Sequence, residues 1–124
     1  MDTRSKILTL EKARSLRFPE LVVVTGYFDL LRADHARELE TVRQRAAGPL
    51  LVVVLPWEEA YMSQRARAEM AAALRMVDYV VAPDMGDAAS LVAALGPAEV
   101  VRLEAADRRR NRELIEHVHR RNSA

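Results

Sequence analysis

The sequence predicts a doubly wound α/β domain, in which helices cover both faces of a parallel sheet. Two observations predict it: valine-rich apolar runs recur along the chain, and segments with helical character separate them. Apolarity within the runs is continuous rather than alternating, which is typical of parallel strands buried on both faces. Because strands alternate with helices, we expect βαβ units with right-handed crossovers.

Four runs are the expected strands. They read LVVVT at 21–25, LLVVVL at 50–55, VDYVVA at 77–82 and, more weakly, AEVVRLE at 98–104. Helices are expected in the segments 9–16, 32–47, 63–76, 86–96 and 107–121. Gly48-Pro49 and Gly96-Pro97 are stop signals for two of these helices.

The composition places bounds on function. The chain has 124 residues, a formal net charge of +1, no cysteine, and hydrophobic residues at half of its positions. This length predicts one domain, residues 1–124. The balanced charge favours neither nucleic acid nor a membrane surface as a partner, and no apolar run approaches the roughly 20 residues that span a bilayer. The lack of a signal-peptide core at the N-terminus predicts a cytoplasmic protein.

A glycine turn after the first expected strand is the natural place to look for a site. In open α/β sheets, ligands bind outside the carboxyl ends of the strands, where the strand order switches direction. Gly26 allows a close approach, and a helix that starts near Arg32 would direct free N–H groups at an anion. His35 could donate to a phosphate, and Arg32 could clamp one. The same residues also fit a simple strand-end turn and an exposed first helical turn, with Asp34 as a plain N-cap.

Three stretches carry a resemblance to a known family. Residues 22–35, VVVTGYFDLLRADH, are similar to a valine-rich strand followed by Gly-Cys-Phe-Asp-Leu-Leu-His-x-Gly-His. Residues 67–81 are similar to Arg-Ala-Glu-x-x-x-Ala-Leu-x-x-Val-Asp-x-Val, and residues 91–104 to Leu-Pro-Asp-Val-x-Val-Lys-Gly. With these motifs the chain resembles the cytidylyltransferase-like nucleotidyltransferase superfamily over about residues 5–104. Within that superfamily, the resemblance is nearest to the heptose 1-phosphate adenylyltransferases and the glycerol 3-phosphate cytidylyltransferases.

The resemblance implies a Rossmann-like fold of three layers, α/β/α. We expect the strand order 3-2-1-4, with the crevice between the first and fourth strands. The implied reaction moves a nucleotidyl group from an NTP to a phosphorylated sugar or polyol, releasing pyrophosphate with the help of Mg²⁺. The resemblance implies His35 and Arg32 as the catalytic residues that hold phosphates. It implies as nucleotide- or phosphate-binding residues Gly26, Tyr27, Phe28, Asp29, Arg67 and Arg102.

Departures from the motifs fall on positions that would contact phosphate. Arg32 stands where the motif has its first histidine, and Asp34 stands where it has glycine. A carboxylate ~4 Å from a phosphate charge costs about 1 kcal/mol in water and about 4 kcal/mol at an effective dielectric of 20. The Lys-Gly-x-Asp stretch is replaced at residues 102–105, and the late Ser/Thr-rich nucleotide-binding motif has no counterpart.

Two functional hypotheses therefore stay open. The first is a degenerate member with little or no transferase activity, which binds a phosphorylated ligand or a partner. The second is an active transferase, in which Arg32 replaces the lost histidine. A receiver or flavodoxin-like module is a third class, but receivers need clustered acids at strand ends, and the first strand here ends in Thr25-Gly26.

Other residues predict packing and assembly. Asp29 is expected to fix a loop as a hydrogen-bond acceptor rather than to act as a general base. Trp57, Tyr61 and Met62 lack an obvious core partner, so they could frame a base or form a dimer contact, and we predict a homodimer. Arg108–Arg110 fit a solvated helix start or an anion-binding patch. The two histidines near the C-terminus are two residues apart on a helix and face apart, so no metal site is expected.

Overall fold

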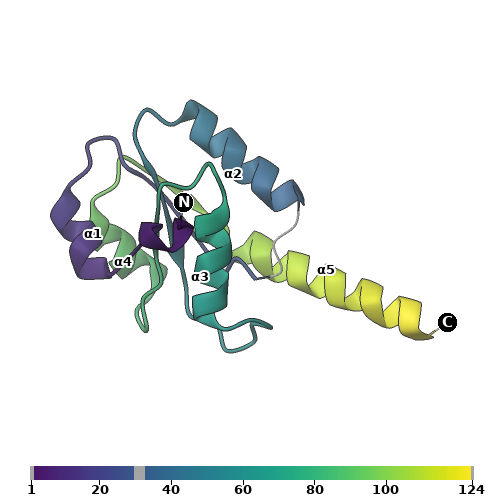
Figure 1. The fold of residues 1–124 in the computed structure, drawn as a ribbon. Coiled ribbons are helices and arrows are strands. Elements are labelled where there is room, and N and C mark those ends of the chain that lie inside the picture. Colours follow the sequence, from purple (N-terminus) through teal and green to yellow (C-terminus); the bar gives the residue numbers. More distant parts are fainter. Residues whose placement is uncertain (1, 30–32, 124) are drawn as a thin grey trace.

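A parallel sheet forms the centre of the computed structural model, which describes residues 2–29 and 33–123 (Figure 1). Its five strands lie in the order β1-β4-β3-β2-β5. The strands are β1 (Ile7–Leu8), β2 (Val22–Gly26), β3 (Leu50–Val54), β4 (Tyr79–Val81) and β5 (Glu99–Arg102). The helices are the 3₁₀ turn η1 (Thr3–Lys6), then α1 (Leu10–Leu16), α2 (Ala33–Arg45), α3 (Gln64–Ala73), α4 (Ala88–Leu95) and α5 (Glu104–Ser123).

The sheet confirms the expected fold class. Every strand pair is parallel, and the four expected strands are neighbours in the order β4-β3-β2-β5, which is the order 3-2-1-4. The sheet differs in one detail, because the edge strand β1 pairs with β4 beyond the expected set. A two-residue strand is too short to give a pattern that sequence reasoning can recognise.

Alternate valines of β2 face opposite helical layers. Val22 and Val24 belong to a core that includes Leu39 of α2 and Ala68 of α3. Val23 belongs to a second core with residues of α1 and α4. Figure 1 shows α2 and α3 apart from the α1–α4 pair, as a three-layer arrangement requires. Burial on both faces explains why the runs are continuously apolar instead of alternating.

Local sequence signals set several of the helix ends. The side chains of Thr9, Ser63 and Asp87 are N-caps of α1, α3 and α4, and each accepts a hydrogen bond from a backbone N–H in the first turn. Gly96 ends α4 in the left-handed conformation, with φ of 59°. These short polar side chains satisfy N–H groups that lack a partner within the helix, and glycine takes positive φ without a Cβ clash.

The last helix begins earlier than expected, and this places it over the candidate crevice. The sequence predicted a helix from residue 107, whereas α5 begins at Glu104, directly after β5. The Leu103 N–H continues the sheet by donating to the Thr25 carbonyl at 2.8 Å. The Asp107 N–H then donates to the Leu103 carbonyl at 2.8 Å. Because no loop intervenes, the first turns of α5 lie at the carboxyl ends of β2 and β5, while its distal half extends away from the domain (Figure 1).

Candidate functional site

The turn after β2 presents two consecutive backbone N–H groups to one point. Phe28 has φ of 54°, in the left-handed region that non-glycine residues rarely adopt. Such a turn forms a concave nest of N–H groups, which binds anions. The N–H groups of Tyr27 and Phe28 both donate to Oδ2 of Asp107, at 2.7 and 3.3 Å. The anion in this nest is therefore a carboxylate of the chain's own helix α5.

Gly26 makes this close approach possible. A Cβ atom at this position would lie 2.6 Å from Asp107 Oδ2 and 3.0 Å from the ring of Phe28. Both distances are too short for van der Waals contact, so any side chain would push the carboxylate out of the nest. The sequence predicted that Gly26 allows an anion to approach closely, and the group that does so is Asp107.

His35 belongs to the same cluster. Its side chain is 1% exposed and stacks on the Phe28 ring, with centroids 5.0 Å apart. Its Nε2 atom lies 3.5 Å from Asp107 Oδ1. Arg110, one turn further along α5, places Nη1 3.0 Å from the same oxygen and also pairs with Glu38 of α2. An imidazole and a guanidinium thus flank the carboxylate opposite the two N–H groups.

Asp107 is a buried acid among these donors. It is 2% exposed, and burial raises the pKa of its carboxyl above the ordinary value. The N–H groups of Tyr27 and Phe28 and the charge of Arg110 oppose this rise in pKa, because they stabilise the ionised form. A buried carboxylate is tolerated only when it is hydrogen-bonded and paired. The donors of the turn are therefore committed to Asp107.

Asp29 fixes a loop, as its position suggested. Its two carboxylate oxygens accept hydrogen bonds from the backbone N–H groups of Tyr61 and Met62, at 2.7 and 3.1 Å. The side-chain amide of Asn111 on α5 also donates to it, at 2.8 Å. Asp29 therefore links the turn after β2 to the loop between β3 and α3 and to the last helix. Its predicted contact with a nucleotide stays a prediction.

Arg67 is buried at the base of the same two loops. Its Nη1 atom donates to the carbonyls of Tyr27 and Leu55, the residues that follow β2 and β3, at 2.8 and 2.9 Å. Burial lowers the pKa of the guanidinium, and the charge of Asp29 opposes this. With 2% of its surface exposed, Arg67 ties the two strand ends together. A small part of its surface borders a hollow beside the loop after β3, and its role toward a nucleotide stays a prediction.

Arg102 and Tyr27 face a hollow beside the nest. The Arg102 side chain is half-exposed at the end of β5 and pairs with Glu104 at 3.3 Å. Together with Tyr27 and Arg108 it borders a hollow of about 350 Å³ at the carboxyl end of the sheet. The structure thus places Arg102 near the cluster but outside it.

Trp57, which was expected to frame a base or to form a dimer contact, stacks on the Tyr27 ring with centroids 4.5 Å apart.

Arg32 is predicted as the partner of His35, but it lies outside the described residues. The side chain of Asp34 also lies outside the described part of the chain. Their expected effects on phosphate binding therefore stay predictions. They rest on the motif and not on observed contacts.

Three comparisons bear on the family. No family model matches the sequence. The bifunctional protein HldE of Geobacter sulfurreducens is 32% identical over 112 residues, or 82% of this chain, and HldE of Helicobacter pylori strain P12 is 33% identical over 111 residues. The crystal structure of a lipopolysaccharide core biosynthesis protein from Thermoplasma volcanium matches 64% of this chain and 70% of its own, with a TM-score of 0.58 and 23% identity. That likeness shows a shared fold.

The chain belongs to the cytidylyltransferase-like nucleotidyltransferase superfamily. It spans 22% of the length of the Geobacter relative and 24% of the Helicobacter relative. The motif that carries the resemblance predicts a phosphate site in the turn after β2, which includes Tyr27, Phe28 and Asp29. The nest of N–H groups at Tyr27 and Phe28 therefore lies where the motif predicts a phosphate site.

The superfamily motifs did not reveal the residues of α5 that complete this cluster. Asp107, Arg110 and Asn111 come from a part of the chain that lies outside the matched motifs. The sequence offered one signal, since Arg108–Arg110 were considered as an anion-binding patch. Arg110 does contact an anionic group, but that group is Asp107 of the same helix.

No metal centre or membrane span is found in the described part of the chain. Residues 2–29 and 33–123 contain no group of three or more His, Asp or Glu side chains that could hold a metal ion. Within the same residues, no helix combines the length and apolarity needed to cross a bilayer.

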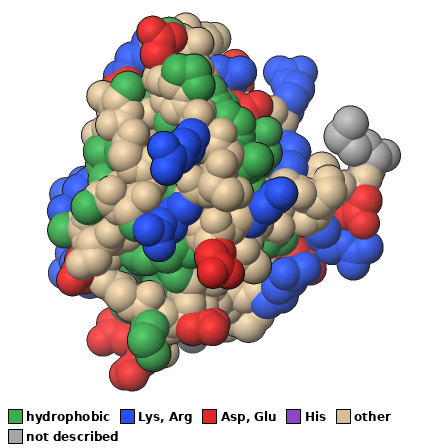
Figure 2. Space-filling view, turned by 90° about the vertical axis from the view of Figure 1, so that its left-hand side faces the viewer, with side chains coloured by type: hydrophobic (Ala, Val, Ile, Leu, Met, Phe, Trp, Pro, Cys, Tyr) green, Lys and Arg blue, Asp and Glu red, His purple; other side chains and the backbone are tan. Residues whose placement is uncertain are grey.

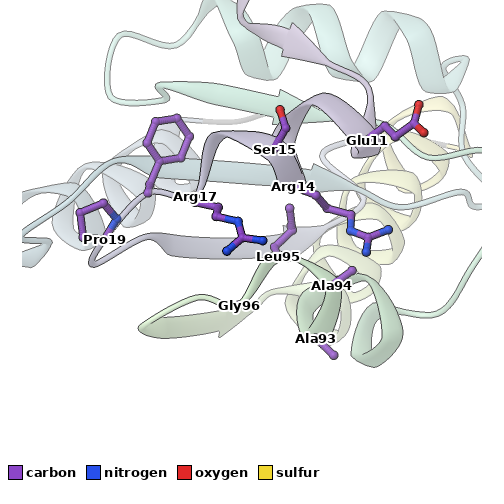
Figure 3. A pocket seen from close by; sticks show the side chains of 10 residues that line it. Glu11, Arg14, Ser15, Arg17, Pro19, Ala93, Ala94, Leu95 and Gly96 are labelled. Carbon is purple, nitrogen blue, oxygen red and sulfur yellow. The ribbon is translucent and has the colours of Figure 1, made fainter.

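A second hollow lies at the opposite end of the sheet from the nest. It measures about 680 Å³ and lies where α1 and α4 end, before β2 and β5 begin (Figure 3). The side chains of Arg14 and Arg17 point along it, beside the small residues Ala93 and Gly96 (Figure 3). The C-terminal ends of helices carry partial negative charge, which disfavours anionic ligands.

The surface charge is mixed on the face drawn in Figure 2, where basic and acidic side chains are interspersed.

Proposed function

We propose that this chain is a superfamily member that does not transfer nucleotidyl groups and that acts by binding a partner. The observation that carries the proposal is the Asp107 carboxylate in the nest after β2. A phosphate bound in this turn would compete with Asp107 for the same N–H groups and for Arg110. Two like charges about 4 Å apart cost about 4 kcal/mol at an effective dielectric of 20. A nucleotide would therefore have to displace a carboxylate that is held in place by the backbone.

Most of the predicted phosphate-binding residues that the structure describes are buried in internal contacts, with Arg102 as the exposed exception. His35, Phe28 and Asp29 are almost fully inaccessible to solvent. Catalysis of this reaction requires donors that are free to bind the charge developing on the leaving pyrophosphate. Loss of one such donor costs about 10²–10³ in rate, so donors committed to Asp107 support a chain with no useful turnover.

Pyrophosphate release is the direct test of the proposal. With Mg²⁺, ATP or CTP, and a panel of sugar, polyol and heptose phosphates, we expect release at the background rate. Calorimetry with the same nucleotides should show weak or absent binding. Steady turnover near ~1 s⁻¹ that is abolished by His35→Ala, but not by the control His117→Ala on exposed α5, would establish an active transferase instead. In that case Arg32 would be a working replacement for the histidine of the motif.

For the partner, we propose a second copy of this chain. The distal part of α5 carries Leu114, Ile115 and Val118 on one side, and Tyr61 of the loop after β3 lies beside them. Tyr61 is 64% exposed and Val118 is 46% exposed. The distal half of α5 does not pack on the domain. Its own hydrogen bonds give it little stability, because helices are stabilised mainly by tertiary packing. An apolar stripe there fits an antiparallel copy of the same helix.

Charges around the stripe support a two-fold arrangement. Exposed Glu58 and Glu59 lie in the loop next to Arg112, and the exposed Arg120 and Arg121 lie two turns further along α5. A two-fold axis near residue 116 sets Arg120 of one copy at the level of Arg112 in the other, where Glu59 lies. Each copy then offers arginines to the glutamates of the other, as an isologous interface requires.

Sedimentation velocity tests this assembly. We expect a dimer at high micromolar concentration, and a monomer for Val118→Asp, because a charge would be buried in the apolar stripe. Arg120→Glu should weaken the dimer, and adding Glu59→Arg to it should restore association. Val100→Asp is the matched control, because Val100 is also exposed but lies on β5. A wild-type chain that stays monomeric, or a dimer unaffected by Val118→Asp, would contradict the proposal.

A further inference from the structure

The cluster around Asp107 has the donor set of an oxyanion site. Oδ2 of the carboxylate accepts the two backbone N–H groups of the nest. Oδ1 lies 3.0 Å from Arg110 Nη1 and 3.5 Å from His35 Nε2. Consecutive N–H groups, an imidazole and a guanidinium together suit a phosphate-like anion better than a single carboxylate. Loop fixation alone would not require a cation, a ring nitrogen and a left-handed turn on the same two oxygens.

We propose that Asp107 is an internal substitute for a phosphate group and that it closes a latent site for inorganic phosphate and pyrophosphate. This inference rests on the proposed function, since it explains why a chain with this turn would not bind nucleotides. The tethered carboxylate competes with a free anion because it is always present beside the nest. Removing the carboxylate uncovers the donors, while the two N–H groups, His35 and Arg110 stay in place.

The Asp107 carboxylate fills the position that an exchanged anion would take, and a hollow lies nearby. Gly26 has no side chain, and the space its Cβ would fill is occupied by Asp107 Oδ2. The first turn of α5 separates this carboxylate from the neighbouring hollow of about 350 Å³, which Tyr27, Glu104 and Arg108 border. A free anion would take the position between the two N–H groups and Arg110 that the Asp107 carboxylate now fills, beside that hollow.

The experiment compares wild type with Asp107→Ala and with a control, Glu113→Ala, an exposed acid on the same helix. Calorimetry and thermal unfolding are measured with sodium phosphate, sodium pyrophosphate and sodium chloride at equal ionic strength. We expect Asp107→Ala to bind phosphate at least about tenfold more tightly than wild type. The Tyr27 and Phe28 amide resonances should shift on titration. Wild type and Glu113→Ala should respond to phosphate no more than to chloride.

A folding defect in Asp107→Ala would not leave the inference untested. If the variant is unfolded in chloride, phosphate or formate should restore its circular dichroism, because either anion fills the vacated position. A folded variant without a gain in phosphate affinity, or an unfolded variant that neither anion rescues, would overturn the inference. Turnover by the wild-type chain would instead overturn the proposed function, so the two failures are distinguishable.

Discussion

Replacing Arg67 with methionine is expected to destabilise the fold by about 3–5 kcal/mol. The guanidinium makes two charge-assisted hydrogen bonds, to the carbonyls of Tyr27 and Leu55, in a position with 2% exposure. Methionine fills a similar volume but donates nothing, so both carbonyls lose this donor in a dry environment. The loss falls on the ends of β2 and β3, which are the central pair that carries the candidate site.

Urea unfolding with circular dichroism measures this effect. The matched control is Arg65→Met, because Arg65 lies on the same helix but is exposed and forms an i,i+4 ion pair with Glu69. Such pairs contribute about 0.3–0.5 kcal/mol. If Arg67→Met lowered the unfolding free energy no more than the control did, the carbonyl contacts would not support the fold. Arg67 would then be available to a ligand, as the superfamily motif implied.

The sheet was predictable because burial on both faces leaves a strong local signal. Continuous valine runs marked β2, β3 and β4, whereas β5, which alternates between half-buried and exposed residues, gave only a weaker signal. The position of the crevice between β2 and β5 was an expectation that came with the resemblance. Two details were not predictable. Strand β1 depends on pairing with β4 and not on its own sequence. The start of α5 at Glu104 depends on where the last sheet bond, from Leu103 to Thr25, lies.

The sequence predicted the residues that the motif after β2 contributes to the candidate site, but not the residue that α5 contributes. Gly26 and His35 were found because they lie in one short motif, and Asp29 was expected to fix a loop. Asp107 could not be recognised, because its partners lie about 80 positions away in sequence. A single aspartate in the first turns of a helix is more often a favourable charge near the helix N-terminus. Its role arises from the absence of a loop between β5 and α5.

Asp29→Ala is expected to destabilise the fold by about 2–4 kcal/mol. The substitution leaves the N–H groups of Tyr61 and Met62 and the amide of Asn111 without their shared acceptor. It also removes the negative charge that favours the ionised form of buried Arg67. Hydrogen exchange at Tyr61 and Met62 should become fast, since these amides would lose protection before the sheet opens.

A control variant and a double variant test the role of Asp29 further. The control Asp84→Ala removes an exposed acid and should change the unfolding free energy by no more than about 0.5 kcal/mol. The double variant Asp29→Ala with Arg67→Met should cost less than the sum of the single variants, because neither substitution then leaves a buried charge without its opposite. Strict additivity would mean that the two charges act independently. Unchanged exchange at Tyr61 and Met62 in Asp29→Ala would mean that this carboxylate does not hold the loop.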